Sequence, residues 1–458
     1  MRIQGVRAGV LSDYHTGSNR GPIGRSLPRC LRTGGQAALA CECPLETGAV
    51  PARPSYSRTL DDTSLRTNVL EKAGEAVRIL HVADVNVQAR ADGVSAAVLT
   101  LARSEAAMGH AVALLSRRAA TSDMAEAISA DNITVLPAVS RLPGSIKRVI
   151  GEWSPDVAHF GYLWNPDSSV AARQLKQLTI PYVVSPHGAL QQRELRRSQW
   201  KRFKKAVYLR LLDARMLRNA NAIRCVSDAE EAVIRSFLPD ARTVVIPNGV
   251  TWPYATAHLG PPTGSVRLGY IGRLDPYNKG LDLLSELAKH LTAKGFRVSL
   301  EIAGRWQQRF AAELLKLMLA HTELPGAPTI SFHGQILDEA RVGFFSEVDI
   351  YVQYSRWELF GMSIVEAMLA GVPVAISESC DLAAEAGRAG AALVLSSDPA
   401  YAASQLADLW KQPPLRMTMV KRARRWASRR FDPHEIARRT TSLYAEVLAG
   451  PPRPEEME

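Results

Sequence analysis

From residue 77 onward, strand-like and helix-like segments alternate along the chain, and this alternation restricts the possible folds more than any other feature. A β-branched run at residues 77–82 is followed by a helical pattern over residues 95–108. Gly109 ends that pattern, and the apolar run at residues 111–115 predicts the next strand. Strand, helix and strand within about 40 residues are typical of a βαβ unit with parallel strands.

The alternation continues in two series, which are separated by a linker rich in Pro and Gly that runs to about Gly264. Further strands of the first series are predicted at residues 133–136, 156–160, 182–185, 222–226 and 243–246. Strands of the second series are predicted at residues 266–271, 298–303, 330–332, 350–352 and 372–376, with helices at 281–290, 311–319 and 433–448 among those between and after them. The pattern predicts an α/β protein with two open parallel sheets, each flanked by helices, and a ligand at the carboxyl ends of the strands, in the cleft between two domains.

With 458 residues, the chain is too long for one hydrophobic core, so two domains are expected. We place an N-terminal domain at residues 77–255, a C-terminal domain at 265–430, and a last helix at 431–449 that packs back toward the N-terminal domain. Residues 1–76 are rich in Arg, Gly, Pro and Ser and have no apolar period. Two interpretations of them stay open: a disordered extension, or a coding sequence whose start is placed too early.

Apolar runs and cysteines bear on the location of the protein. No apolar run approaches the roughly 18 residues of a membrane span, and no long apolar stretch follows the basic N-terminus as in a secretion signal. The five cysteines, which show no paired spacing, are Cys30, Cys41, Cys43, Cys225 and Cys380. We interpret them as free thiols, with a metal site at Cys41 and Cys43 as the weaker alternative. A cytoplasmic protein is therefore expected.

Much of the net charge of +11 is concentrated between Arg193 and Arg218, a segment that contains ten basic residues and two acidic ones. Apolar side chains such as Trp200 and Phe203 are interleaved with them. A basic amphipathic helix at 191–220 would attach the protein peripherally to the inner face of the membrane and suit a lipid-linked acceptor. The alternative is a solvated helix that packs on its own domain. A nucleic-acid-binding protein is a third interpretation, which only the charge favours, because no recognition motif accompanies it.

The segment Gly272–Gly280 follows a predicted strand and opens a predicted helix. A helix start offers unpaired N–H groups and a positive dipole end, which suit a phosphate. Arg273 and Lys279 add two cations, which fit a diphosphate better than a single carboxylate. The alternative is a solvated basic loop.

Two carboxylates, Glu358 and Glu366, stand eight residues apart around Gly361. Glu358 comes just after a predicted strand, and an ionised carboxylate can accept hydrogen bonds from two adjacent sugar hydroxyls. Glu366 has a structural alternative, because Ser363 and Glu366 fit a capping box at a helix start. Glu358 has no such local role.

With these motifs, the chain resembles the retaining glycosyltransferases of family 4, which have the GT-B fold of two Rossmann-like domains facing each other across a deep cleft. The resemblance covers residues 77–448. Its main marks are Gly272-Arg273 with Lys279-Gly280, and Glu358-x7-Glu366 followed by Ala367-Met368 and Gly371-x-Pro373-Val374. Supporting marks are Pro186-His187-Gly188, Ser227-x-x-Glu230, Ile246-Pro247-Asn248-Gly249 and Ala303-Gly304.

The resemblance implies a donor site for a nucleotide diphosphate sugar. Arg273 and Lys279, beside Gly272, would hold the diphosphate, Glu366 the ribose, and Glu358 the donor sugar. Backbone groups near the sugar, phosphates or base would come from Gly93, Phe360, Gly361, Met362 and the stretch Gly334, Gln335 and Ile336. His187 would stand at the reacting centre.

The chain departs from the family pattern at two positions: Asp92-Gly93 replaces the usual Gly-Gly, and Leu359 follows Glu358 where Gly is usual. In a site of the kind that the resemblance implies, Asp92 would place a negative charge near the phosphates and Leu359 would narrow the sugar pocket.

The resemblance implies retention of configuration in hexose transfer to a hydroxyl of a glycan or lipid-linked acceptor, in cell-surface polysaccharide assembly. No D-x-D string occurs, so we predict transfer without a metal and without a cofactor other than the nucleotide sugar co-substrate. A nucleotide-sugar 2-epimerase of the same fold is the alternative enzyme.

Overall fold

The computed structural model describes residues 76–85, 93–116, 128–136, 143–190, 212–252, 265–306 and 327–450, together with residues 310, 312 and 316. Several sequence predictions lie outside these residues: the N-terminal extension up to residue 75, Asp92, most of the basic segment 191–220 and most of the helix at 311–319.

The first sheet has seven parallel strands in the order β3-β2-β1-β4-β5-β6-β7. Its strands are β1 (Arg78–Val82), β2 (Ala111–Leu115), β3 (Ile133–Leu136), β4 (Val157–Phe160), β5 (Tyr182–Val184), β6 (Ala222–Cys225) and β7 (Thr243–Val245). Its helices are α2 (Gly93–Ala107), α4 (Pro143–Trp153), α5 (Pro166–Gln177), α8 (Ala214–Arg218) and α9 (Asp228–Phe237). β4, β5 and β6 are buried at every position, which explains why their residues are apolar apart from the buried His159 and Arg224.

The second sheet has six parallel strands in the order β10-β9-β8-β11-β12-β13. Its strands are β8 (Ser265–Ile271), β9 (Arg297–Ala303), β10 (Thr329–Gly334), β11 (Ile350–Gln353), β12 (Val374–Ser377) and β13 (Leu393–Leu395). The helices of this part are α10 (Leu281–Ala293), α12 (Asp338–Glu347), α13 (Met362–Ala370), α14 (Ala383–Arg388), α15 (Pro399–Trp410) and α16 (Pro413–Arg430). The predicted pair of parallel sheets with flanking helices is confirmed, and β13 is a strand that the sequence did not predict.

In each sheet the strand order reverses once, between β1 and β4 in the first and between β8 and β11 in the second. Connections leave the two strands of such a pair toward opposite sides, so a crevice opens outside their carboxyl ends, where ligands of this fold class bind. β8 and β11 are direct neighbours, with Ile350 opposite Leu268 and Tyr351 opposite Gly269. The chain that follows these two strands is therefore the first place to look for a site.

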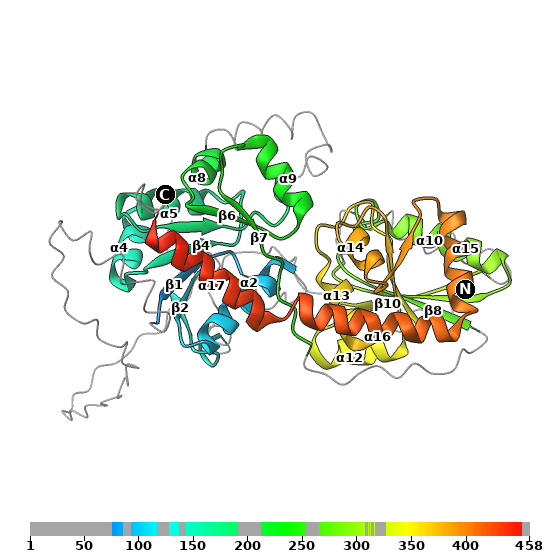
Figure 1. Ribbon diagram of the computed structural model, residues 1–458. Helices are drawn as coiled ribbons and strands as arrows, with labels where there is room; N and C mark the ends of the chain where they lie inside the picture. Colours follow the sequence, from blue (N-terminus) through cyan, green and yellow to red (C-terminus); the bar gives the residue numbers. More distant parts are fainter. Residues whose placement is uncertain are drawn as a thin grey trace, which may run out of the picture. The chain divides into compact units, whose positions relative to one another are not determined.

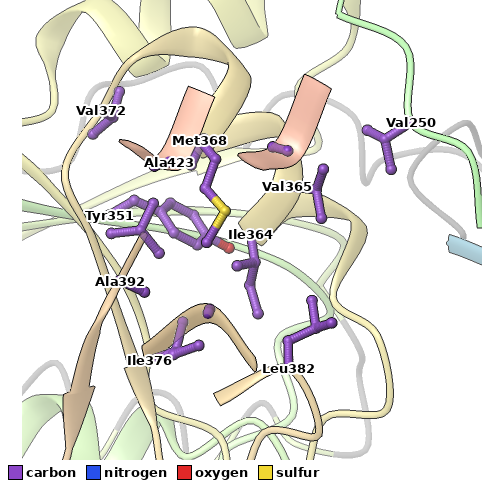
Figure 2. Packing of buried hydrophobic residues seen from close by; sticks show 14 of the residues in the cluster. Val250, Tyr351, Ile364, Val365, Met368, Val372, Ile376, Leu382, Ala392 and Ala423 are labelled. Atoms are coloured by element: carbon purple, nitrogen blue, oxygen red, sulfur yellow. The ribbon is translucent and has the colours of Figure 1, made fainter. Parts of the chain in front are cut away.

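A large apolar cluster fixes α13 against the second sheet. Figure 2 shows Ile364 and Val365 of α13 together with Tyr351 of β11 and Ile376 of β12 in this cluster. All four side chains are fully buried. Because tight packing allows little displacement, this cluster holds the loop before α13 and the first turn of the helix in place.

Capping signals explain where several helices begin. The helices α5, α15 and α17 (Pro433–Ala449) each begin with a proline, and the residue before it caps the helix: Asn165, Asp398 and Asp432 respectively. A side-chain oxygen of each cap accepts a backbone N–H of the first turn. Proline suits this position because its missing N–H would have had no partner in the helix.

The last helix, α17, packs on the first sheet and beside α2, as Figure 1 shows. Its side chains Ile436, Leu443 and Val447 join a buried cluster with Ile79 of β1 and Val183 of β5. The last helix of the chain thus packs on the first sheet. The preceding helix, α16, instead contacts α13 and α15 in the second part of the chain.

Tyr444 carries the polar part of this contact. Its hydroxyl donates to Glu105 Oε1 of α2 at 3.0 Å and lies 2.6 Å from His159 Nδ1 of β4, while the second oxygen of Glu105 lies 2.6 Å from His81 Nε2 of β1. All four side chains are buried. Burial, followed by the Glu105 charge, raises the pKa of Tyr444 well above its usual value, so the phenol remains a proton donor.

Replacing Tyr444 with phenylalanine is expected to lower the free energy of unfolding by about 1–3 kcal/mol, because Glu105 and His159 lose a partner in a buried place. The shift of the thermal midpoint measures the effect. Tyr401→Phe is the matched control, since this side chain on α15 is 60% exposed. Equal midpoints for the two variants would contradict the role assigned to the Tyr444 hydroxyl.

Candidate active site

The candidate site is formed by the two loops that leave the neighbouring strands β8 and β11. The first loop, residues 272–280, packs against the end of β11 at Gly280, which has φ +63°. A Cβ at Gly280 would lie 2.0 Å from the carbonyl oxygen of Tyr354. Only glycine fits this close approach and this backbone conformation, so the sequence pair Lys279-Gly280 brings the Lys279 side chain to the β11 loop.

Lys279 and Glu358 form an ion pair at the point where the two loops meet. Lys279 Nζ lies 2.5 Å from Glu358 Oε2, and each side chain is 13% exposed. Gln353 Nε2 also donates to Glu358 Oε2 at 3.2 Å, and Gln353 Oε1 in turn accepts from the hydroxyl of Tyr351 at 2.7 Å. Lys279, which is predicted to bind the diphosphate, and Glu358, which is predicted to bind the donor sugar, are therefore in direct contact. The Glu358 carboxylate has a fixed orientation.

Arg273, the second predicted phosphate ligand, is exposed on the same loop. The backbone around it is anchored, because its carbonyl accepts from the hydroxyl of Tyr270 at 2.9 Å and the N–H of Gly272 donates to Ala303 at 3.0 Å. A Cβ at Gly304 would lie 1.7 Å from the carbonyl oxygen of Gly272. The glycines let the ends of β8 and β9 approach closely, while the Arg273 side chain stays accessible to a ligand.

The N-terminus of α13 lies in the same loop as Glu358. Gly361, with φ +71°, caps the helix without a side chain, and the helix begins at Met362. A Cβ at Gly361 would lie 3.1 Å from Glu358 Cγ. The positive dipole end of this nine-residue helix thus lies close to the Glu358 side chain. The preceding Phe360 is buried and packs edge-on against Phe431.

The capping-box interpretation of Ser363 and Glu366 is wrong. The helix begins one residue before Ser363, whose hydroxyl donates to the carbonyl of Ile271 at 3.0 Å instead of capping. Glu366 forms an ion pair with Arg341 of α12, and each of these side chains is 14% exposed. Burial raises the pKa of Glu366, and the Arg341 guanidinium opposes that shift. Glu366 is therefore not accounted for by a cap.

The stretch predicted to face the base follows the edge strand β10. Gly334 ends the strand with φ +67°, and its carbonyl accepts from the N–H of Gly304 at 2.7 Å. Gln335 is exposed and Ile336 is half-buried against the α13 cluster. These residues lie at the same edge of the sheet as the other candidate residues, followed by α12, which carries Arg341.

The candidate residues of the first part of the chain are His187, which follows β5, and Gly93, the first residue of α2. Burial of the ring, together with the Arg224 guanidinium, lowers the pKa of His187 to about 3, so its imidazole is neutral at physiological pH. A Cβ at the next residue, Gly188, would lie 3.0 Å from Leu359 Cδ2, and one at Gly93 would lie 3.6 Å from Met362 Cγ. The structure thus brings the His187 loop and the start of α2 to the loop that carries Glu358.

The sequence prediction missed two polar residues of the site, Gln353 and Arg341. Gln353 is a polar residue at the end of an apolar strand, a signal that could have been used. Arg341 gave no such signal, because it is one of many charged residues on helices and its partner Glu366 belongs to another helix.

Cys225 and Cys380 are buried free thiols, as expected. Burial raises the pKa of both, so neither is a reactive thiolate. The other three cysteines lie outside the described residues.

Comparisons with known proteins agree with this geometry. The chain matches the family model of the glycosyl transferase 4-like domain over residues 92–249 and that of the glycosyl transferases group 1 over residues 256–426. A glycogen synthase of Mycobacterium tuberculosis is 26% identical over 312 residues, which cover 66% of this chain and 72% of the relative.

Solved structures share the fold. A sucrose-phosphate synthase from Thermosynechococcus elongatus superposes with a TM-score of 0.64 at 19% identity, covering 82% of this chain and 100% of the other. HepE of Anabaena, solved in complex with UDP and glucose, superposes with a TM-score of 0.62 at 19% identity, covering 81% of this chain and 99% of the other. The chain therefore belongs to the group 1 glycosyltransferases, of family 4 type, and is a hexosyltransferase with the two-domain α/β GT-B fold.

Proposed function

We propose that the protein transfers a hexose from a nucleotide diphosphate sugar to a hydroxyl of a glycan or lipid-linked acceptor, with retention of configuration and without a metal ion. The observation that carries the proposal is the meeting of Lys279 and Glu358 beside the N-terminus of α13, at the carboxyl ends of β8 and β11. A cation, a carboxylate and a helix N-terminus at one point suit a sugar joined to a diphosphate.

Each proposed role follows from the chemistry of the group. Lys279 and Arg273, with the backbone at Gly272, bind the diphosphate. Glu358 accepts from sugar hydroxyls and Glu366 from ribose hydroxyls, since a carboxylate accepts from two neighbouring hydroxyls. The remaining contacts are backbone groups of Gly93, Phe360, Gly361, Met362, Gly334 and Ile336.

Retention is proposed to proceed without a protein nucleophile. The Glu358 carboxylate accepts from both Lys279 and Gln353, and these bonds reduce its readiness to attack the anomeric carbon. The acceptor hydroxyl would attack from the face that the diphosphate leaves, and a phosphate oxygen would take its proton. His187, which is neutral, would contribute hydrogen bonds at this centre rather than a positive charge.

Charge stabilisation by the protein underlies the proposed metal independence. The departing diphosphate gains negative charge in the transition state, and oriented cations and dipoles are the most effective groups for stabilising it. Lys279, Arg273 and the N-terminus of α13 supply such groups from one edge of the sheet.

The acceptor and the cellular setting rest on sequence features. None of the described helices is long and apolar enough to cross a membrane. In the described end of the basic segment, Met216 and Leu217 of α8 are buried in the first core, as expected for a helix that packs on its own domain. We propose that the rest of the segment contacts an anionic membrane surface, consistent with a cytoplasmic enzyme of cell-surface polysaccharide assembly. Co-sedimentation with anionic but not neutral liposomes tests this.

Thermal stabilisation by nucleotide diphosphate sugars is the first test of the donor. The screen starts with UDP-glucose, with which HepE was also solved. Donor incubated alone should remain unchanged, whereas an epimerase would convert the free nucleotide sugar. If no nucleotide sugar stabilises the purified protein, the proposed donor site is wrong.

Transfer is expected to continue at an unchanged rate in EDTA and to give a product with the anomeric configuration of the donor. Turnover is followed by release of the nucleoside diphosphate, and the product linkage is read by proton NMR. Loss of turnover in EDTA that added Mg²⁺ restores would contradict metal independence, and an inverted product would contradict retention.

A further inference from the structure

Glu230 is a buried carboxylate in the first turn of α9, and only 1% of it is exposed. Its two oxygens accept from two backbone N–H groups of different loops: Oε1 from Gly188 at 2.5 Å and Oε2 from Val226 at 2.8 Å. The first loop follows β5 and the second follows β6. One side chain thus joins the loop that carries His187 to the neighbouring strand end.

Helix capping does not account for this carboxylate. Ser227 is the N-cap of α9, and its hydroxyl accepts the N–H of Glu230 at 3.1 Å. In a capping box the Glu side chain would return to the N–H of the cap itself, but here it reaches Val226 and Gly188. A buried carboxylate is costly unless its partners compensate for lost hydration, so its placement needs a reason outside α9.

The backbone that Glu230 holds has an unusual conformation. His187 has φ +49° and Gly188 has φ +77°. A left-handed conformation is unfavourable for a residue with a side chain and persists only where the surroundings impose it. The hydrogen bond from Gly188 to Glu230 is such a constraint, directly after His187.

Charged groups surround this carboxylate on several elements. The Arg224 guanidinium of β6 opposes the effect of burial, which raises the pKa of Glu230, while Asp381 adds to it. Asp381 accepts from Ser227 Oγ at 3.2 Å, and its N–H donates to the carbonyl of Glu358 at 2.9 Å. The groups around Glu230 therefore connect, through Ser227 and Asp381, to the backbone of Glu358.

We propose that Glu230 is a positioning residue that fixes His187 at the reacting centre by holding the N–H of Gly188. The inference rests on the proposed function, in which His187 serves the transfer step. Glu230 itself touches no substrate and acts through the loop.

Glu230→Gln is the test variant, because it keeps the shape of the side chain but presents an NH₂ group to one of the two N–H donors. Glu231→Gln is the matched control, since the next residue is also a Glu on α9 but pairs with Arg235 and Thr243 near the surface. Turnover, the dissociation constant of UDP or of the best nucleotide in the screen, and the thermal midpoint are measured for both.

In Glu230→Gln, kcat is expected to fall about 10- to 100-fold, as for a small misplacement of a reacting group, while the nucleotide dissociation constant stays within about twofold. The control variant Glu231→Gln should have the kcat and the nucleotide dissociation constant of the wild type. Because the pKa of Glu230 is raised, the wild type should lose kcat as pH falls toward the range in which Glu230 is protonated. In the Gln variant the contribution of Glu230 to that acid limb should be absent, so its kcat should fall less steeply with decreasing pH than that of the wild type. An unchanged kcat in a folded Gln variant would overturn the proposal.

Spectra of ¹³C-labelled histidine separate this inference from the proposed function. The His187 signal, assigned with His187→Gln, should shift in Glu230→Gln and not in Glu231→Gln, whether or not the protein transfers sugar. If the wild type transfers no sugar, the proposed function fails while this measurement still decides the positioning. An unshifted His187 signal would overturn the role of Glu230.

Discussion

Lys279→Ala is expected to lower kcat by about 100- to 1000-fold, the range observed when one group that stabilises developing charge is removed from an active site. Lys279 is the half-buried cation of the proposed diphosphate site, with 13% of its side chain exposed. Arg273→Ala is expected to lower kcat by about 100-fold with an unchanged thermal midpoint, because Arg273 is exposed.

Lys279→Ala is also expected to lower the stability of the protein, and the experiment must separate this effect from the change in catalysis. Loss of the Lys279 ammonium leaves Glu358 with the weaker donor Gln353, so a reduced thermal midpoint is expected. Lys279→Ala combined with Glu358→Gln should recover part of that midpoint and none of the turnover. Lys289→Ala is the control, since this lysine of α10 forms an exposed pair with Glu286. Near-normal turnover in both the Arg273 and the Lys279 variants would exclude the assignment.

The sequence predicted both sheets because central strands such as β4, β5, β11 and β12 are buried at every position and so appear as mostly apolar runs between helices. β13 was missed for a physical reason: three residues after a stretch of alanine and glycine give no period to detect. Its pairing with β12 supplies the order that the local sequence lacks.

The S-x-x-E strings that begin at Ser227 and Ser363 show why a motif does not determine its own structure. Ser227 has an extended backbone and caps α9. Ser363 has the same spacing to a Glu, but Gly361 adopts φ +71° and the helix begins at Met362, two residues too early for Ser363 to cap it. The position of the helix start decides the outcome, and the packing around Gly361 sets that start.

The sequence pattern could not predict which residues far apart in the chain contact each other. The pattern placed Lys279 and Glu358 at the same sheet edge, since each follows a strand, yet it did not show that they touch across 79 positions. Their contact depends on the close approach of Gly280 to Tyr354. The link from Glu230 to Gly188 across 42 positions has the same origin, in two neighbouring strand ends.

Arg341→Leu is expected to lower the free energy of unfolding at neutral pH by about 3 kcal/mol, because it leaves the carboxylate of Glu366 buried without a partner. The double variant with Leu at both positions should recover most of that loss, since an apolar pair can replace a buried ion pair at little cost. Thermal midpoints of the wild type, the two single variants and the double variant complete a double-mutant cycle, which measures the coupling between the two side chains.

The pH dependence of this effect follows from the raised pKa of Glu366. A carboxyl group with a raised pKa in the folded state favours folding at low pH, and this contribution is lost as pH rises through that pKa. Removing Arg341 raises the pKa further, so the deficit of Arg341→Leu should be largest at neutral pH and shrink as pH falls toward 4.5, the unperturbed value for Glu. A deficit that is constant with pH would show that lost packing, not the unpaired charge, destabilises the variant.

Donor binding in the double variant then separates the structural role of Glu366 from its proposed role toward the ribose. With its stability restored, the double variant should still bind the nucleotide at least about tenfold more weakly, because no carboxylate remains to accept from the ribose hydroxyls. Calorimetric titration with UDP, or with the best nucleotide of the screen, measures this affinity. A 2′-deoxy analogue should bind the wild type more weakly than the parent nucleotide does, and most of that difference should disappear in the double variant. Wild-type affinity in the stable double variant would leave Glu366 with the structural role alone and move the ribose to another part of the site.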